Sequence, residues 1–243
     1  MVKEAVWVEV SDDSSCLVYR SWYTLNMKRG VVIVALTLVG VLILWGRYED
    51  RFHPGEFFVE HRVPFFSQAP TGNWSGLFQN ACEEAAILMV AAVRQFPYLT
   101  PFDVEKKLTD MVRYEEKQGI GPSMTLASTQ KLLRDLHGVE SEMIERPTVD
   151  LMKHYLQYRL LVIPASGVVL ANPQFRRPLP VYHMLVIIGY DDATGEFIVN
   201  DPGTRFGKSY RYAYEVVMHA MHDWTGSQAT ILKGEKRMLV APL

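Results

Sequence analysis

Cysteine is scarce in this chain, and the scarcity excludes a domain held together by disulfide bonds. The sequence contains only two cysteines, Cys16 and Cys82, and a long apolar block separates them. Small disulfide-rich domains carry even sets of closely spaced cysteines, and no such set is present. An isolated cysteine in an ordered domain is either a small buried apolar residue or a working thiol.

An excess of charge of one sign is also missing. Lysine and arginine number 25 against 27 aspartates and glutamates, which gives a net charge of -2. Proteins that bind nucleic acid usually show a basic excess, so we expect no nucleic-acid partner. The sequence shows no internal repeat and no low-complexity tract. Its hydrophobic content of 49% is typical of a globular protein with a substantial core.

The longest apolar run is residues 30–46, GVVIVALTLVGVLILWG, which contains no charged side chain. As a helix it would measure about 25 Å, close to the hydrocarbon thickness of a bilayer. Lys28 and Arg29 precede it, and Trp45 lies where an aromatic belt forms. We expect a single transmembrane signal anchor, with residues 1–29 in the cytoplasm and the rest exported. A cleaved signal peptide, which would leave a secreted protein, is the alternative, but no small-residue cleavage site follows the run.

The remaining boundaries follow from composition. Residues 1–26 show no periodicity, and Met27 directly precedes two basic residues and the apolar run. We therefore predict that translation begins at Met27, which N-terminal mass spectrometry can test. Residues 47–58 are a charged linker containing proline and glycine, and residues 59–243 form one exported domain.

The order of predicted elements indicates an α+β domain. Hydrophobic spacing and turn residues predict helices over 81–95, 101–118, 125–137, 148–158 and 214–222. They predict strands over 60–66, 160–165, 183–190, 196–200 and 237–241, with a hairpin turn at 191–195. Because helices come first and antiparallel strands later, we expect the helices to pack on one face of an antiparallel sheet.

Cys82 lies at the start of the first predicted helix of this domain. Free N–H groups and the helix dipole at a helix N-terminus favour a thiolate, the form of cysteine that attacks carbonyl carbons. Glu83 and Glu84 follow at once, and their negative charge opposes thiolate formation. A nearby imidazolium would have to outweigh them.

His183 and Asp201 are predicted to become neighbours through a hairpin. His183 opens the apolar strand HMLVIIGY, and Asp201 follows the next strand, in NDPG. Pairing of the two strands through the turn at 191–195 would bring the carboxylate beside the imidazole, where it could orient the ring and stabilise its charged form. Asn200 is the alternative for this role. An acyl-transfer site also needs oxyanion donors, for which the Cys82 backbone N–H and the amide of Gln68 or Gln79 are candidates.

Two segments together resemble a known family. VPFFSQAPTGNWSGLFQNACEEAAILMVA and YHMLVIIGYDDATGEFIVNDPGTRFGKSYRYAY are similar to bacterial peptidases related to bacteriocin double-glycine leader peptidases, family 39 of the cysteine peptidases, in the papain-like superfamily. The stand-alone exported branch is most similar, with its VPxxSQ lead-in, the cysteine that opens a helix, and the H…GYD…DPG ending. The resemblance covers about residues 59–224. Glu83 and Glu84 depart from the glycine that follows the cysteine in many relatives.

The resemblance implies a papain-like α+β fold and a role for each matching residue. Cys82 would be the nucleophile, His183 the general base, Asp201 the orienting acid, and Gln68 the oxyanion donor in preference to Gln79. We expect residues 59–243 to be a thiol-dependent peptidase domain that cuts peptide bonds outside the cytoplasm without a cofactor. The alternatives are an amidase of cell-wall peptides, an acyltransferase on the same scaffold, and an inactive peptide-binding module.

Several other residues could have a function, but a structural or surface role explains them as well or better. His219, His222 and Asp223 could hold a metal ion, but no fourth ligand is evident and a structural role is favoured. The pair Arg176-Arg177 is expected to be solvated. The proline-containing loop 165–180 either shapes a substrate cleft or is simply stiff. Three aromatic residues could line a pocket or belong to the core: Trp74, Tyr190 and Trp224.

Overall fold

The structure, a computed structural model, describes residues 57–96 and 98–243. The predicted cytoplasmic segment 1–29, the start at Met27, the transmembrane segment 30–46 and nearly all of the linker 47–58 lie outside the described residues. Within the described part, no helix is both long and apolar enough to cross a membrane.

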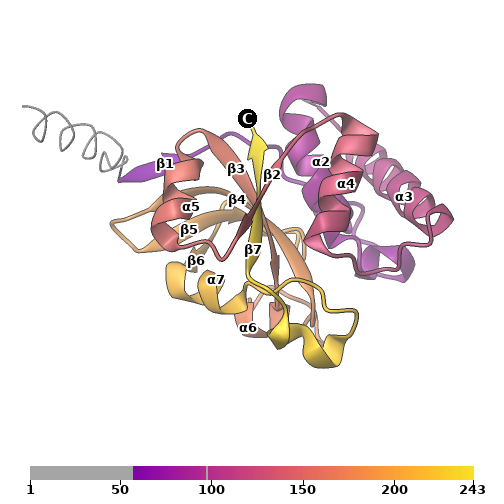
Figure 1. The fold of residues 1–243 in the computed structure, drawn as a ribbon. Helices are drawn as coiled ribbons and strands as arrows, with labels where there is room; N and C mark the ends of the chain where they lie inside the picture. Colours follow the sequence, from indigo (N-terminus) through magenta and orange to yellow (C-terminus); the bar gives the residue numbers. More distant parts are fainter. Residues whose placement is uncertain (1–56, 97) are drawn as a thin grey trace, which may run out of the picture. The chain divides into compact units, whose positions relative to one another are not determined.

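The domain is built on one antiparallel sheet of seven strands (Figure 1). The strand order is β2-β7-β3-β4-β5-β6, and β1 pairs with β4 beyond this path. The strands are β1 (Phe58–Glu60), β2 (Glu142–Glu145), β3 (Arg159–Ala165), β4 (His183–Asp191), β5 (Glu196–Asn200), β6 (Tyr210–Ala213) and β7 (Arg237–Pro242). The predicted α+β class is confirmed.

Helices cover both faces of this sheet, so the prediction that they pack on one face is wrong. The α-helices are α2 (Cys82–Gln95), α3 (Pro101–Lys117), α4 (Leu126–His137), α5 (Val149–Leu156), α6 (Gly167–Leu170) and α7 (Tyr214–Ala220). Alternate residues of β4 join two separate cores: Val186 packs in one core with α2 and α4, and Leu185 in the other with α5 and α7. β3 and β4 are continuous apolar runs, and such strands need cover on both sides.

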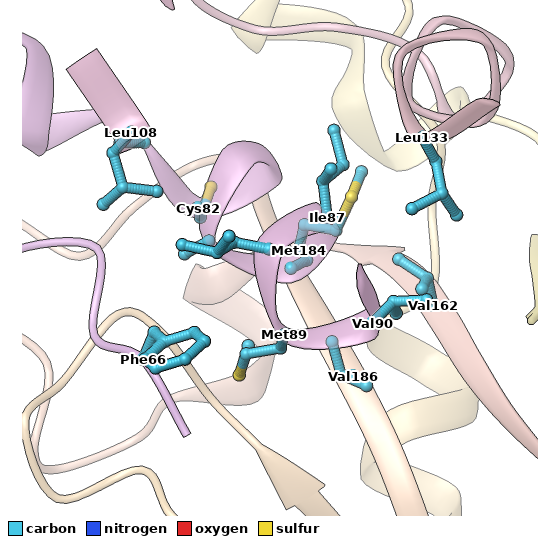
Figure 2. Packing of buried hydrophobic residues seen from close by; sticks show 14 of the residues in the cluster. Phe66, Cys82, Ile87, Met89, Val90, Leu108, Leu133, Val162, Met184 and Val186 are labelled. Atoms are coloured by element: carbon cyan, nitrogen blue, oxygen red, sulfur yellow. The ribbon is translucent and has the colours of Figure 1, made fainter. Parts of the chain in front are cut away.

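Helix α2 is the central helix of the domain and lies directly on β4 (Figure 2). Its residues from Cys82 to Ala92 are all buried, because α3, α4 and the sheet surround it. Small side chains such as Ala85 and Ala86 let the helix approach the strand closely. Met89 and Met184 fill the space between them, with flexible side chains suited to irregular gaps. This packing fixes the start of α2 relative to the start of β4.

Several short elements differ from the sequence prediction. The predicted strand 60–66 is paired only at its beginning, in β1, and the chain then runs on as an irregular segment toward α2. Strands β2 and β6, with sequences EMIE and YRYA, are additional, as are α6 and the 3-10 helices η2 (Gly76–Gln79) and η3 (Gln228–Lys233). Such four-residue strands lack the apolar run that marks β3 and β4, so their pairing depends on the neighbouring strand.

Candidate active site

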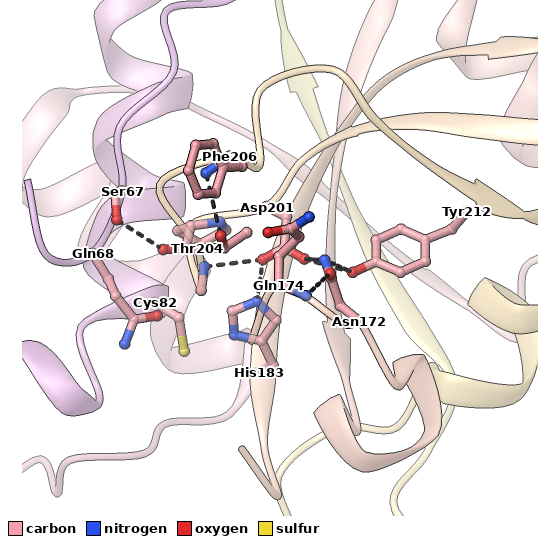
Figure 3. A network of polar contacts seen from close by, with 12 residues as sticks. Ser67, Gln68, Cys82, Asn172, Gln174, His183, Asp201, Thr204, Phe206 and Tyr212 are labelled. Atoms are coloured by element: carbon pink, nitrogen blue, oxygen red, sulfur yellow. Dashed lines mark hydrogen bonds and ion pairs between the residues drawn. The ribbon is translucent and has the colours of Figure 1, made fainter. Parts of the chain in front are cut away.

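Cys82 and His183 line one cavity of about 840 Å³. Cys82 is the first residue of α2 and His183 the first residue of β4, so the packing of the helix on the strand brings the two together. Figure 3 shows the Cys82 sulfur next to the His183 ring. The backbone N–H of Met184, the residue after the histidine, also hydrogen-bonds the sulfur and acts to lower the thiol pKa.

His183 and Asp201 are in direct contact and are both almost completely buried. Nε2 of the imidazole lies 2.7 Å from Oδ1 of the carboxylate. Burial by itself raises the pKa of Asp201, but the attraction of His183 and the hydrogen bonds to the carboxylate lower that pKa below its usual value. Because an ionised carboxylate only accepts, Nε2 carries the hydrogen and Nδ1 of the neutral ring is left as an acceptor. Figure 3 shows this second nitrogen on the Cys82 side.

Two residues that the sequence analysis did not single out hold the carboxylate of Asp201. Asn172 Nδ2 and the Tyr212 hydroxyl donate to Oδ2, at 3.1 and 2.6 Å. The backbone N–H of Gly203 donates to Oδ1 at 2.9 Å. The turn NDPG supplied a signal for Gly203. Asn172 lies in the loop 165–180 noted as a possible wall of the cleft, but nothing in the sequence indicated its contact with Asp201, and Tyr212 lies in the short strand β6, which was not predicted.

Asn200, the alternative to Asp201, has a structural role instead. Its amide nitrogen donates to the carbonyl of Val63 at 3.4 Å, and its oxygen accepts from the backbone N–H of Ser209 at 3.1 Å. The side chain is fully buried and joins the lead-in segment to the β5-β6 connection. Within the described residues, Asp201 is the partner of the imidazole.

Gln68 and Gln79 both line the cavity with Cys82, but their side-chain amides differ in burial and in hydrogen bonding. Gln68 is buried, and its Nε2 donates to the carbonyls of Phe78 and Gln79 at 2.9 and 3.0 Å. These two bonds use both of its N–H donors. Gln79 is exposed, and its side chain makes no hydrogen bond to any residue that the structure describes. Gln68 would have to release one carbonyl before donating to a substrate, whereas Gln79 would not.

Glu83 is in direct contact with the thiol. Sγ of Cys82 donates to Oε2 of Glu83 at 2.8 Å, and the other carboxylate oxygen accepts from the backbone N–H of Met124 at 3.2 Å. Burial raises the pKa of Cys82, and the negative charge of Glu83 raises it further. Glu83 therefore disfavours the thiolate, as expected from the sequence, and it does so in direct hydrogen-bonding contact with the thiol.

The residues around the imidazole leave it little freedom. Phe175 packs edge-on against the His183 ring, with centroids 5.1 Å apart. A methyl group added at Gly203 would lie 2.8 Å from Cε1 of His183 and 2.8 Å from the Phe175 ring. Only a glycine fits between the DPG turn and the imidazole without moving one of them.

Two of the three residues considered as metal ligands, His222 and Asp223, have structural roles, which the sequence analysis favoured. Asp223 accepts the backbone N–H groups of Leu126 and Trp224, each at 2.8 Å, and contacts Arg237 at 3.4 Å. His222 Nδ1 bonds the carbonyl of Gly234 at 3.0 Å. No group of metal-binding residues occurs in the part of the chain that the structure describes. A metal site at 219–223 is therefore not supported.

The three aromatic candidates have different surroundings. Trp74 lines the cavity. Tyr190 is completely buried in the core between the sheet and α5, so the pocket-lining reading is wrong for it. Trp224 lies against Tyr182, another lining residue, with ring centroids 5.3 Å apart.

The α+β domain and the cavity that holds a cysteine and a histidine can be compared with known protein families. The family model described as "Peptidase_C39 like family" matches residues 60–230. The chain belongs to this family, which confirms the resemblance recognised in the sequence.

Solved structures and curated proteins add two findings. A crystal structure from Bacillus anthracis, provisionally assigned as a C39-like peptidase, is similar at a TM-score of 0.49 and 12% identity, over 75% of this chain and 96% of that one. No curated protein matches the chain.

Proposed function

We propose that the domain is a thiol-dependent peptidase with Cys82 as nucleophile, His183 as general base and Asp201 as orienting acid. The observation that supports this most strongly is the cavity in which the thiol meets an imidazole whose far nitrogen is held by a buried carboxylate. Family membership supports a peptide substrate. The arrangement matches what the papain-like scaffold requires, with a cysteine on a helix N-terminus and a histidine on a strand.

The chemistry proceeds by acyl transfer. Nδ1 of His183 takes the proton from Cys82, and the thiolate attacks the carbonyl carbon of the scissile bond. The backbone N–H of Cys82, free at the helix start, and an amide from Gln68 or Gln79 hold the developing oxyanion. His183 then gives its proton to the departing amine, which leaves a thioester on Cys82. Water, deprotonated by His183, hydrolyses that thioester and restores the thiol.

The Glu83 contact gives this reaction a distinct starting state. The Cys82 thiol donates to Glu83, so the nucleophile begins as a buried thiol. Substrate binding has to turn the S–H group toward His183 before transfer can begin. Asp201 helps because it stabilises the imidazolium that forms.

We also propose that this activity operates outside the cytoplasm, on a domain held at the membrane by residues 30–46. The support is the apolar run and its basic flank in the sequence. The linker 47–58 would separate the domain from the bilayer surface.

A second candidate function is a peptide-binding module without catalysis. The observation that favours it is the hydrogen bond from Cys82 to Glu83, because burial and this negative neighbour both keep the thiol protonated. The amidase and acyltransferase alternatives differ from the peptidase only in acceptor or substrate.

Digestion of a peptide library by the wild-type protein and by Cys82→Ala tests the proposal. We expect cleavage products from the wild type and none from the variant, read by mass spectrometry. Muropeptides offered in parallel separate a cell-wall amidase from a peptidase. Binding of peptides by both proteins with cleavage by neither would establish the binding module instead.

A further inference from the structure

The loop from α6 to β4 is anchored at the candidate active site. Asn172, at its start, is buried and donates to Asp201 Oδ2 at 3.1 Å and to the Tyr212 hydroxyl at 2.7 Å. Phe175, three residues later, is buried against the His183 ring. The loop is thereby fixed to both members of the His183–Asp201 pair, and residues that follow Phe175 have a defined place beside the cavity.

Arg176 and Arg177 are those residues, and both line the cavity that holds Cys82. The sequence prediction that this pair is merely solvated is therefore incomplete, although both side chains are exposed. The guanidinium of Arg176 lies 5.8 Å from the ring centre of Trp74, in cation–π range. Trp74 belongs to the segment before α2, so this contact joins two walls of the cavity.

Neither arginine has a carboxylate partner among the residues that the structure describes. Other arginines on the same domain are paired: Arg211 with Asp191 at 2.9 Å, and Arg237 with Glu145 at 2.8 Å. One carboxylate lines the cavity, that of Glu83, and it is buried and bonded to Cys82 and Met124. Besides His183, the remaining polar residues that line the cavity are uncharged: Gln68, Gln79, Asn80, Ser123, Tyr182 and Gln228.

We propose that Arg176 and Arg177 make the cavity select peptides with an acidic side chain close to the scissile bond. The planar guanidinium offers paired N–H donors that match a carboxylate, and such charge-assisted bonds are stronger than neutral ones. Two unpaired cations beside a thiol and a neutral polar lining complement an anionic substrate. This inference rests on the proposed function only in taking the cavity as the place where a peptide binds.

Matched peptides that carry Glu, Gln or Lys at each position around a cleaved bond provide the test. The proteins to compare are the wild type, Arg176→Ala/Arg177→Ala, Arg176→Glu/Arg177→Glu and, as the matched control on the exposed side of α3, Arg113→Ala. We expect the wild type to favour Glu over Gln about 10- to 100-fold in kcat/KM at one or two positions, the range of a charge-assisted hydrogen bond. The double alanine variant should bring the ratio close to one, the double glutamate variant should favour Lys, and Arg113→Ala should behave as the wild type.

Binding to the Cys82→Ala protein, measured by fluorescence anisotropy at two salt concentrations, separates this inference from the proposed function. We expect tighter binding of the Glu peptides, and a smaller preference in high salt because exposed charges are screened. If Glu peptides bind more tightly than Gln peptides but the wild type cleaves neither, the role of the two arginines stands and the proposed peptidase activity is rejected. Cleavage with the same Glu-to-Gln ratio in wild type and both double variants would overturn the arginine assignment.

Discussion

Glu83 is the residue that most distinguishes this site, because it accepts a hydrogen bond from the thiol of the nucleophile. Its Oε2 accepts from Sγ of Cys82 at 2.8 Å and its Oε1 is fixed by Met124. A carboxylate in this position disfavours a thiolate, whereas an amide could donate to one. Glu83 therefore adds to burial in keeping the thiol protonated.

Glu83→Gln is expected to make Cys82 more reactive at low pH. Burial, the largest cause of the raised thiol pKa, persists in the variant, but the charge of Glu83 is removed. The thiol pKa should fall, because a like-charged contact is lost. The pH dependence of iodoacetamide alkylation measures it. Glu84→Gln, which removes a more weakly acting charge and no contact with the sulfur, should shift the curve less, and an equal shift would contradict the role of the hydrogen bond.

Asp201→Asn tests the orienting carboxylate. The amide can still meet His183 but it lacks the charge that stabilises the imidazolium and fixes the tautomer. We expect kcat/KM to fall by about 100- to 10,000-fold, as in comparable triads, with little change in KM. Tyr212→Phe, which removes one donor to Asp201, should cost far less. Full activity of Asp201→Asn would remove the carboxylate from the mechanism.

At the level of single residues, the sequence predicted which side chains meet but not how their hydrogen bonds are arranged. The proximity of the Cys82 sulfur, the His183 imidazole and the Asp201 carboxylate could be predicted from a helix start, a strand start and a hairpin. The donors of Gln68 turned out to be engaged with two backbone carbonyls, and the Cys82 proton with Glu83. Such choices depend on local packing at distances below 4 Å, which residue order and periodicity do not encode.

At the level of elements, α2 and α3 share a buried pair of carboxyl groups. Glu84 of α2 donates to Glu115 of α3, and both side chains are almost fully buried. Burial raises the pKa of Glu115 to about 7, and burial with the neighbouring charges raises that of Glu84. The folded protein thus binds protons more tightly here than the unfolded chain does, and stability falls as pH rises.

Glu115→Gln is expected to remove part of this pH dependence. The stabilising contribution of the protonated group is complete below about pH 4.5, the value of an unfolded glutamate, and is lost as pH rises through about 7. The variant should be more stable than the wild type at pH 8 by about 1–2 kcal/mol and of similar stability at pH 4.5. Urea unfolding at both pH values measures this. A variant destabilised equally at both would contradict the account.

The long elements could be predicted from the sequence because each contains its own signal. Helix α3 begins at Pro101 after the N-cap Thr100, two residue types that mark a helix start, and the structure shows a capping box between Thr100 and Asp103. β2 and β6 could not be found, since four polar-rich residues become a strand only beside β7 and β5. The second layer of helices does have a signal in the sequence, because the unbroken apolar runs in β3 and β4 indicate burial on both faces.

At the scale of the whole molecule, the proposed anchor predicts where the protein is found. The full chain should fractionate with membranes and resist a high-pH carbonate wash, because residues 30–46 are long and apolar enough to span. A chain without residues 1–46 should be released into the soluble fraction. Release of the full chain by carbonate would reject the anchor, and a mature N-terminus after residue 46 would establish a cleaved signal instead.

In the proposed mechanism the Cys82 sulfur becomes covalently attached to the substrate. Intact-protein mass spectrometry during turnover of a cleaved peptide, quenched rapidly in acid, tests this most directly. We expect an adduct with the mass of the acyl fragment, located on Cys82 by fragmentation, and no such adduct in Cys82→Ala or in Cys82→Ser. Peptide cleavage that persists in Cys82→Ala, or an adduct on another residue, would contradict it.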